Sequence, residues 1–282
     1  MNRLSTEKRA QVIGCLVEGM SLRGTCRITG VARQTVNNLL LDLGDACTRY
    51  MDTAFRNLDI KRVEADEIWA FVGSKDKNVP EGHEDDPDYG SIWTWVAIDA
   101  DTKLVASWLV GDRGIEDCYT FLRDLKGRIL NGQRIQLSTD GLGMYQSVVD
   151  SLWRNGIDYG IVIKDYGSTK TDENHRYSPA TCKSIEKRVI AGDPDERKIS
   201  TSYVERQNLT MRMSNRRYTR LTNAHSKRAE QHAASVALHF AYYNLVRCHE
   251  TLGKRVTPAM AAGVEKHPWT LIDLAHLLET SN

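Results

Sequence analysis

Apolar residues recur with a helical period over the first fifty residues, and three short helices are predicted there. The first begins at Thr6 and runs to about Gly19, and breaks at residues 19–21 and 29–30 separate it from the next two. The third helix repeats its apolar residues at i, i+3, i+4 and i+7, which forms one stripe for packing. This stripe consists of Val36, Leu39, Leu40 and Leu43.

The face opposite this stripe is polar. It carries Arg33, Gln34, Thr35, Asn37 and Asn38. Arginine pairs with guanine edges, and asparagine and glutamine pair with adenine. A short turn precedes the helix, and the stretch SLRGTCRITGVARQTVNNLL resembles a helix-turn-helix unit that binds DNA. The alternative is a plain three-helix packing module.

Beyond residue 60 the pattern changes to β-branched and aromatic runs. We predict strands at 62–72, 91–99, 103–111, 134–139 and 158–164, and helices at 115–128 and 142–155. The order is therefore βββαβαβ. Residues 165–200 are polar and irregular, which indicates loops or a hairpin. Helices are predicted again at 201–213, 226–249 and 270–279.

Composition excludes several classes of protein. The 282 residues are 41% hydrophobic, which supports a large core, and a net charge of +1 means that only local clusters of charge can indicate a nucleic-acid partner. The six cysteines form no Cys-x-x-Cys pair, which argues against a zinc ribbon. No apolar run approaches the roughly 20 residues that span a bilayer. We therefore expect a cytoplasmic, nucleoid-associated protein with no membrane partner.

Three acidic residues stand out by their context. Asp140 ends a β-rich run in STDGLGMY and is either an ordinary turn residue or a carboxylate presented for chemistry. Asp66 lies within a strand whose apolar neighbours imply burial, and a buried charge requires a partner such as a metal ion. Glu205 opens a helix on which Asn208 and Arg212 follow on the same face.

The segments that contain these acids resemble a known family. ADEIWAFVG, STDGLGMY and YVERQNLTMRM, in this order, are similar to the three acidic motifs of DDE transposases of the insertion-sequence-one type. The resemblance continues through NRRYTRLTNAHSK and YYNLVRCHETL and covers nearly the whole chain from about Glu64.

This resemblance implies an α/β fold with a mixed sheet, namely a ribonuclease H-like βββαβαβα core followed by C-terminal helices. The expected organisation has four parts. They are a helix-turn-helix domain at 1–45, a linking helix at 46–60, a catalytic domain at 61–250 and a C-terminal tail with a helix at 251–282.

The resemblance also implies that Asp66, Asp140 and Glu205 converge as catalytic residues and ligands of two Mg²⁺ or Mn²⁺ ions. Such an ion pair activates the attacking oxygen and stabilises the leaving oxygen in phosphodiester displacement. Glu67 is expected on the opposite face of its strand, in a structural or supporting role. Alternative choices for the third acid are Glu186, Asp195 and Glu196.

Seven basic residues and no acidic ones occur between positions 206 and 228. They are Arg206, Arg212, Arg216, Arg217, Arg220, Lys227 and Arg228. Such a run is expected to bind phosphates, with Tyr218 available for stacking, and its alternative is a solvated charged face. Arg212 falls where related enzymes carry a basic residue for phosphate near the site.

Together these features predict an insertion-sequence transposase that cuts and joins DNA strands. Its partners would be the DNA ends of the element, the target DNA and further copies of the same chain. Two alternatives remain: a helix-turn-helix regulator without cleavage activity, and a ribonuclease H-like nuclease that hydrolyses DNA without joining it.

Overall fold

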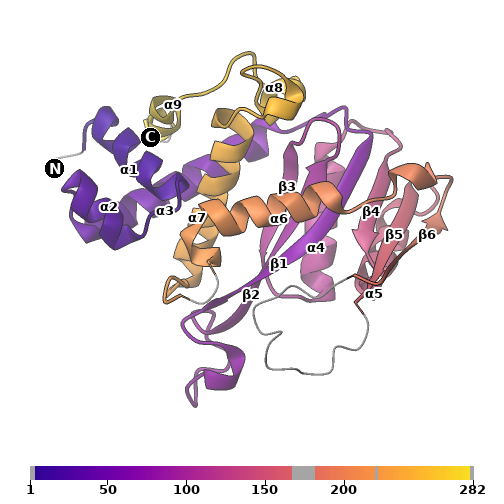
Figure 1. The fold of residues 1–282 in the computed structure, drawn as a ribbon, viewed down its shortest axis with the longest axis horizontal. Helices are drawn as coiled ribbons and strands as arrows, with labels where there is room; N and C mark the ends of the chain where they lie inside the picture. The colour runs from indigo at the N-terminus through magenta and orange to yellow at the C-terminus, as the bar shows by residue number, and fades with distance from the viewer. Residues whose placement is uncertain (1–3, 167–181, 220–221, 280–282) are drawn as a thin grey trace.

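The N-terminal part of the computed structural model contains the three predicted helices (Figure 1). The structure describes residues 4–166, 182–219 and 222–279. The first three helices are α1 (Thr6–Val17), α2 (Leu22–Thr29) and α3 (Arg33–Ala54). The Ser21 hydroxyl accepts a hydrogen bond from the Gly24 amide at 3.0 Å and caps α2, and Gly30, with φ of 71°, ends it. The predicted breaks are therefore confirmed.

Helix α3 continues without interruption for 22 residues, a length of about 33 Å at 1.5 Å per residue. The predicted linking helix at 46–60 is consequently the second half of α3, which ends at Ala54. Buried Phe55, Leu58 and Ile60 then lead into the sheet. A single continuous helix thus connects the proposed DNA-binding unit with the rest of the chain.

Within the described residues, six strands form one mixed sheet in the order β3-β2-β1-β4-β5-β6. They are β1 (Arg62–Val72), β2 (Gly90–Asp99), β3 (Val105–Gly111), β4 (Gln136–Asp140), β5 (Asp158–Asp165) and β6 (Ser184–Ala191). The β1–β4 and β4–β5 pairs are parallel, and the other pairs are antiparallel. The mixed sheet confirms the predicted fold class, and β1 to β5 have the ribonuclease H order. Strand β6 adds a sixth member from the segment predicted as loops or a hairpin.

Helices cover both faces of the sheet (Figure 1). Helices α4 (Ile115–Arg128) and α5 (Gly143–Trp153) lie on one face, and α6 (Ser202–Ser214) crosses the other face over β1. The remaining α-helices of the described residues are α7 (Ala229–Ala241), α8 (Pro258–Ala261) and α9 (Leu271–His276). Among the described helices, none has the length and apolarity that crossing a membrane requires.

The N-terminal helices pack directly on the C-terminal ones. Helix α3 lies against α7 so closely that a Cβ at Gly44 would stand 2.5 Å from the Cα of Ala234. Helix α9 lies on α1, where the Thr6 hydroxyl donates to the Glu279 carboxylate at 3.2 Å. Buried apolar residues of α1, α3 and the sheet form one continuous core.

The contact at Gly44 makes a prediction about stability. Gly44→Ala places a methyl group inside the α3–α7 contact, so we expect a loss of about 1–3 kcal/mol in the free energy of unfolding. The matched control is Gly127→Ala on α4, where the nearest atom to the new Cβ is 3.9 Å away. Helix propensity alone should stabilise that variant by up to about 1 kcal/mol. Urea unfolding measures both, and equal effects would contradict the packing argument.

Candidate functional site

The parallel pairing of β1 with β4 places two aspartates side by side. Glu64 pairs with Ser138, so Asp66 and Asp140 each lie two residues further along their strands. Asp140 is the last residue of β4 and its Oδ1 accepts a hydrogen bond from the Leu142 amide at 3.0 Å. Asp140 therefore forms a local turn, and one of its carboxylate oxygens also lies within 4.8 Å of one of Asp66.

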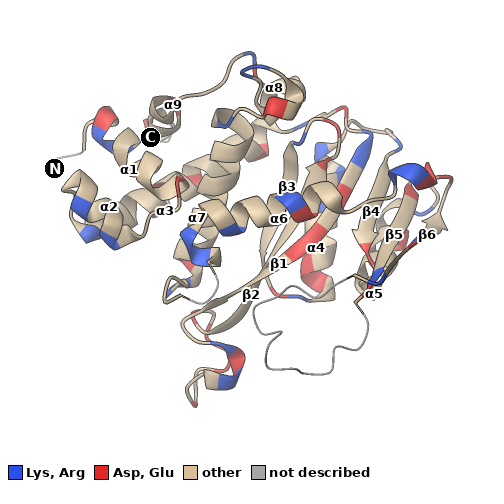
Figure 2. Ribbon diagram, viewed as in Figure 1, with Lys and Arg blue, Asp and Glu red and all other residues tan. Residues whose placement is uncertain are grey.

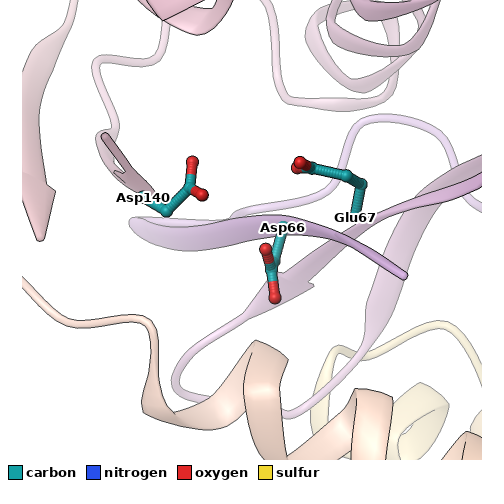
Figure 3. Close-up of side chains that lie close together, drawn as sticks. All are labelled: Asp66, Glu67 and Asp140. Carbon is teal, nitrogen blue, oxygen red and sulfur yellow. The ribbon is translucent and has the colours of Figure 1, made fainter. Parts of the chain in front are cut away.

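Glu67 joins this pair. Ligand oxygens of Asp66, Glu67 and Asp140 all lie within 4.8 Å of one another. Figure 3 shows that the Glu67 and Asp140 carboxylates lie on one side of the strand and Asp66 on the other. The alternation of β1 thus holds, but Glu67 still lies in the cluster. In the sequence, the position of Glu67 next to Asp66 is the one feature that indicates its place in the cluster.

Two partners hold the buried Glu67 carboxylate. The Arg113 guanidinium donates to Oε1 at 2.8 Å from Nε, and the Tyr145 hydroxyl donates to Oε2 at 3.2 Å. Arg113 also lies 4.7 Å from the centre of the Trp93 ring. Arg113 and Tyr145 were not expected from the sequence to take part in the site.

Burial and repulsion between the carboxylates disfavour the ionised form of the acids in this cluster. Burial, which is the largest cause, and the charges of Glu67 and Asp140 together raise the pKa of Asp66 to about 7. Burial also raises the pKa of Glu67, and the nearby Arg113 opposes that shift. A group of oxygen ligands alone, with like charges to be neutralised, suits a hard divalent cation such as Mg²⁺.

Helix α6 is fixed over these carboxylates by two contacts from β1. Oε2 of the buried Glu64 accepts hydrogen bonds from the Tyr203 and Val204 amides at 2.6 and 3.1 Å and so caps the helix. Asn208 Nδ2 donates to Asp66 Oδ2 at 2.9 Å. Glu64 was missed as a contributor to the site, although it precedes Asp66 by two residues and so shares its face of the strand.

Glu205 lies on α6 one turn before Asn208. It lines the same cavity of about 580 Å³ as Asp66 and Asp140, and Arg212 lines that cavity too. Its carboxylate is paired with the Lys164 ammonium from β5 and accepts a hydrogen bond from the Thr201 hydroxyl. Glu205 thus shares the cavity but stands outside the compact cluster of three carboxylates.

The other candidates for the third acid lie elsewhere. Glu186 on β6 pairs with Arg188, and Asp195 pairs with Arg197. Neither they nor Glu196 lines the cavity that contains Asp66 and Asp140. Of the four glutamates and aspartates considered, Glu205 alone faces it.

The polar face of the third helix is mainly on the surface. Arg33, Gln34, Thr35 and Asn38 are exposed, whereas Asn37 is half-buried. Gln34 Nε2 donates to Asn38 Oδ1 at 2.8 Å. Ala32 at the N-cap of this helix supplies no side-chain hydrogen bond.

The basic run extends from α6 into the turn before α7 (Figure 2). Arg206, Arg216, Lys227 and Arg228 are exposed, Arg212 and Arg217 are half-buried, and Arg220 lies outside the described residues. Arg228 pairs with Asp88 at 2.9 Å. The expected stacking role of Tyr218 is wrong, because its ring is buried and its hydroxyl bonds to Thr94 and His232 at 2.5 and 2.9 Å.

No family model and no curated protein matches the chain. Matching solved structures include the piggyBac transposase synaptic complex with hairpin DNA, which is 11% identical with a TM-score of 0.39 over 99% of this chain and 73% of that one. The Mos1 strand transfer complex is 15% identical with a TM-score of 0.24 over 56% of this chain. This chain spans 59% of the Mos1 chain in that match.

The raised pKa of Asp66 predicts how stability depends on pH in the absence of divalent cations. The folded chain binds this proton more tightly than the unfolded chain, so stability falls as pH rises from about 4 through about 7. Asp66→Asn removes this loss and should raise the free energy of unfolding at pH 8 by about 2–4 kcal/mol, with little gain at pH 4.

The matched control for this prediction is Asp158→Asn. The pKa of Asp158 is lowered by its hydrogen bonds with Arg134, so that variant should lose stability at pH 8. Chemical denaturation in a chelator measures both variants. A gain for Asp66→Asn that does not change with pH would show that relief of charge is not its cause.

Proposed function

We propose that the chain is a DDE-type DNA transposase that cleaves and joins DNA strands with divalent metal ions. The observation that carries the proposal is the pairing of β1 with β4, which sets Asp66 beside Asp140 under a helix that carries Glu205. The sequence motifs around these residues support the insertion-sequence-one type. The end-recognition unit would be residues 1–45 and the catalytic unit residues 61–250.

Asp66 and Asp140 would hold Mg²⁺ or Mn²⁺, with Glu205 as the third ligand. When bound, two such ions supply charge stabilisation for in-line displacement at phosphorus. Asn208 orients Asp66 through its amide, and Arg113 fixes Glu67 beside the pair. Glu205 is already held in the cavity by its ion pair with Lys164, which it would exchange for the metal.

Two further groups of polar residues would bind the DNA. Arg33, Gln34, Thr35, Asn37 and Asn38 would contact base edges in the major groove. The basic run from Arg206 to Arg228 would bind phosphates and lead the strand towards the cavity, where Arg212 lies. Because both ends of the element have to be joined together, a homo-oligomer on DNA is part of the proposal.

The proposed reaction has two displacements. A water molecule first attacks a phosphodiester bond at the end of the element and leaves a 3′-hydroxyl on the DNA. That hydroxyl then attacks a phosphodiester bond of the target, which forms one new bond and breaks one. A nuclease of the same fold would stop after the first displacement.

Asp140→Asn separates catalysis from recognition. We expect cleavage to fall by about 10³-fold or more, which corresponds to about 4 kcal/mol of barrier, because a ligand of the centre is lost. Binding to duplexes selected by the wild-type chain from a random library should be unchanged. The control is Asp150→Asn, an exposed position on α5. Gel assays of cleaved and joined products measure both steps.

Three outcomes of that assay are informative. Joined products from the wild type support a transposase, and cleaved but unjoined products indicate a nuclease. Binding without either product, at every divalent cation tested, indicates a regulator and overturns the proposal.

Arg33→Ala tests base recognition. Loss of one bidentate contact to guanine should weaken binding to the selected sequence by about 1–3 kcal/mol and relax preference at one position. Arg123→Ala, an exposed arginine on α4, is the control and should leave preference unchanged. Competition binding against single-base variants of the site measures the effect. An unchanged preference for Arg33→Ala would move recognition to another surface.

A further inference from the structure

Three neighbouring cavities form a series from the third helix to the carboxylates. The first, of about 530 Å³, is lined by Arg33 of α3 and by Arg216 and Arg217 of the turn after α6. The second, of about 400 Å³, shares Arg217, Asn223 and His225 with the first. It shares Arg212 with the third cavity, which holds Asp66 and Asp140. We call the second cavity the middle cavity. It lies between the cavity beside the proposed recognition helix α3 and the cavity that holds the proposed catalytic carboxylates.

The middle cavity is lined by aromatic rings. The Phe71 and His225 rings are stacked with centroids 4.5 Å apart, and the Trp69 ring lies 5.8 Å from Phe71. All three are half-buried. The Trp69 indole donates to the Ser91 hydroxyl at 2.8 Å, and His225 Nε2 contacts the Gly73 carbonyl at 2.9 Å, so both rings are fixed from outside the cavity.

Positive charge surrounds these rings. Lys75 Nζ lies 5.8 Å from the centre of the Phe71 ring and 6.0 Å from that of Trp69. The Arg217 guanidinium donates to the Ser226 hydroxyl at 3.0 Å, and within the described ranges no carboxylate forms an ion pair with it. A half-buried guanidinium bonded to one neutral hydroxyl retains donors for an anion such as a phosphate.

We propose that the middle cavity binds an unpaired nucleobase of the DNA strand whose phosphodiester lies at the carboxylates. The base would lie against Trp69 and Phe71, and the phosphates beside it would bind Arg217 and Arg212. This inference rests on the proposed function and adds to it a local opening of the duplex.

The reason is that stacking needs a free base face. Within a duplex both faces of a base are covered by its neighbours, so rings of this kind offer nothing to paired DNA. Aromatic rings beside cations bind single strands of any sequence, because every base has such a face. A groove that held only duplex phosphates would need the arginines but not Trp69 and Phe71.

Fluorescence anisotropy with the full-length chain in a chelator tests the proposal. We expect Phe71→Leu to weaken binding of an eight-residue oligothymidine by about tenfold, because the aromatic face is lost. Binding of the selected duplex through the third helix should change less than twofold. Phe71→Tyr, which keeps the ring, should bind as the wild type does. Tyr119→Leu on α4 is the aromatic control, because Tyr119 lines a different cavity.

Equal weakening of single-strand and duplex binding by Phe71→Leu, or no change in either, would overturn the inference. A second measurement uses the wild type alone. An oligonucleotide that contains 5-iodouracil is cross-linked to the chain by ultraviolet light. We expect it to be attached to the peptide that carries Trp69 and Phe71 or to the peptide that carries His225. Cross-links to other peptides alone would also overturn it. Because binding is measured without divalent cations, failure of strand transfer does not affect this result, whereas a wild type that binds neither DNA form refutes both proposals.

Discussion

Repulsion among carboxylates held within 4.8 Å of one another is the constraint on which the rest of the centre depends. Each of the three acids has a polar partner from a different part of the chain: Glu67 has Arg113 before α4, Asp66 has Asn208 of α6, and Asp140 has the Leu142 amide after β4. Removing Arg113 would leave the buried Glu67 carboxylate without its cation, which is more costly than losing a surface ion pair. The elements around the sheet are thus linked to the site through hydrogen bonds to its carboxylates.

Helix α6 shows how backbone geometry is converted into a site. Alternation along β1 directs Glu64 and Asp66 to the same face. Glu64 accepts hydrogen bonds from the amides at the start of the helix, and Asp66 accepts one from Asn208 one turn later. The helix is therefore held at two positions along its axis. With its axis set in this way, Glu205 and Arg212 necessarily enter the same cavity. Glu64, a carboxylate outside the acidic motif, therefore determines where Glu205 lies.

Local patterns predicted most of the fold. Strand β1 and helix α4 begin and end where their apolar runs do, and serine caps and glycine breaks define the first helices. What the sequence left out depends on tertiary contacts. The exposed strand β6 forms because it pairs with β5. Tyr218 is buried where its hydroxyl bonds to Thr94 of β2 and His232 of α7. Glu67 enters the cluster because Asp140, at the end of β4, lies beside it. No periodicity encodes such contacts between distant segments.

The close approach of Gly44 to Ala234 has a consequence for how the specificity of the proposed DNA-binding unit would change. Helix α3 carries both the polar face near its start and the contact with α7, and α9 covers α1 from the other end of the chain. The first 45 residues are therefore not an exchangeable cassette. A chimera that takes this unit from another protein would have to bring matching surfaces of α7 and α9 with it. If the exposed face of α3 contacts bases as proposed, point substitutions on that face would change specificity more readily than exchange of the whole unit.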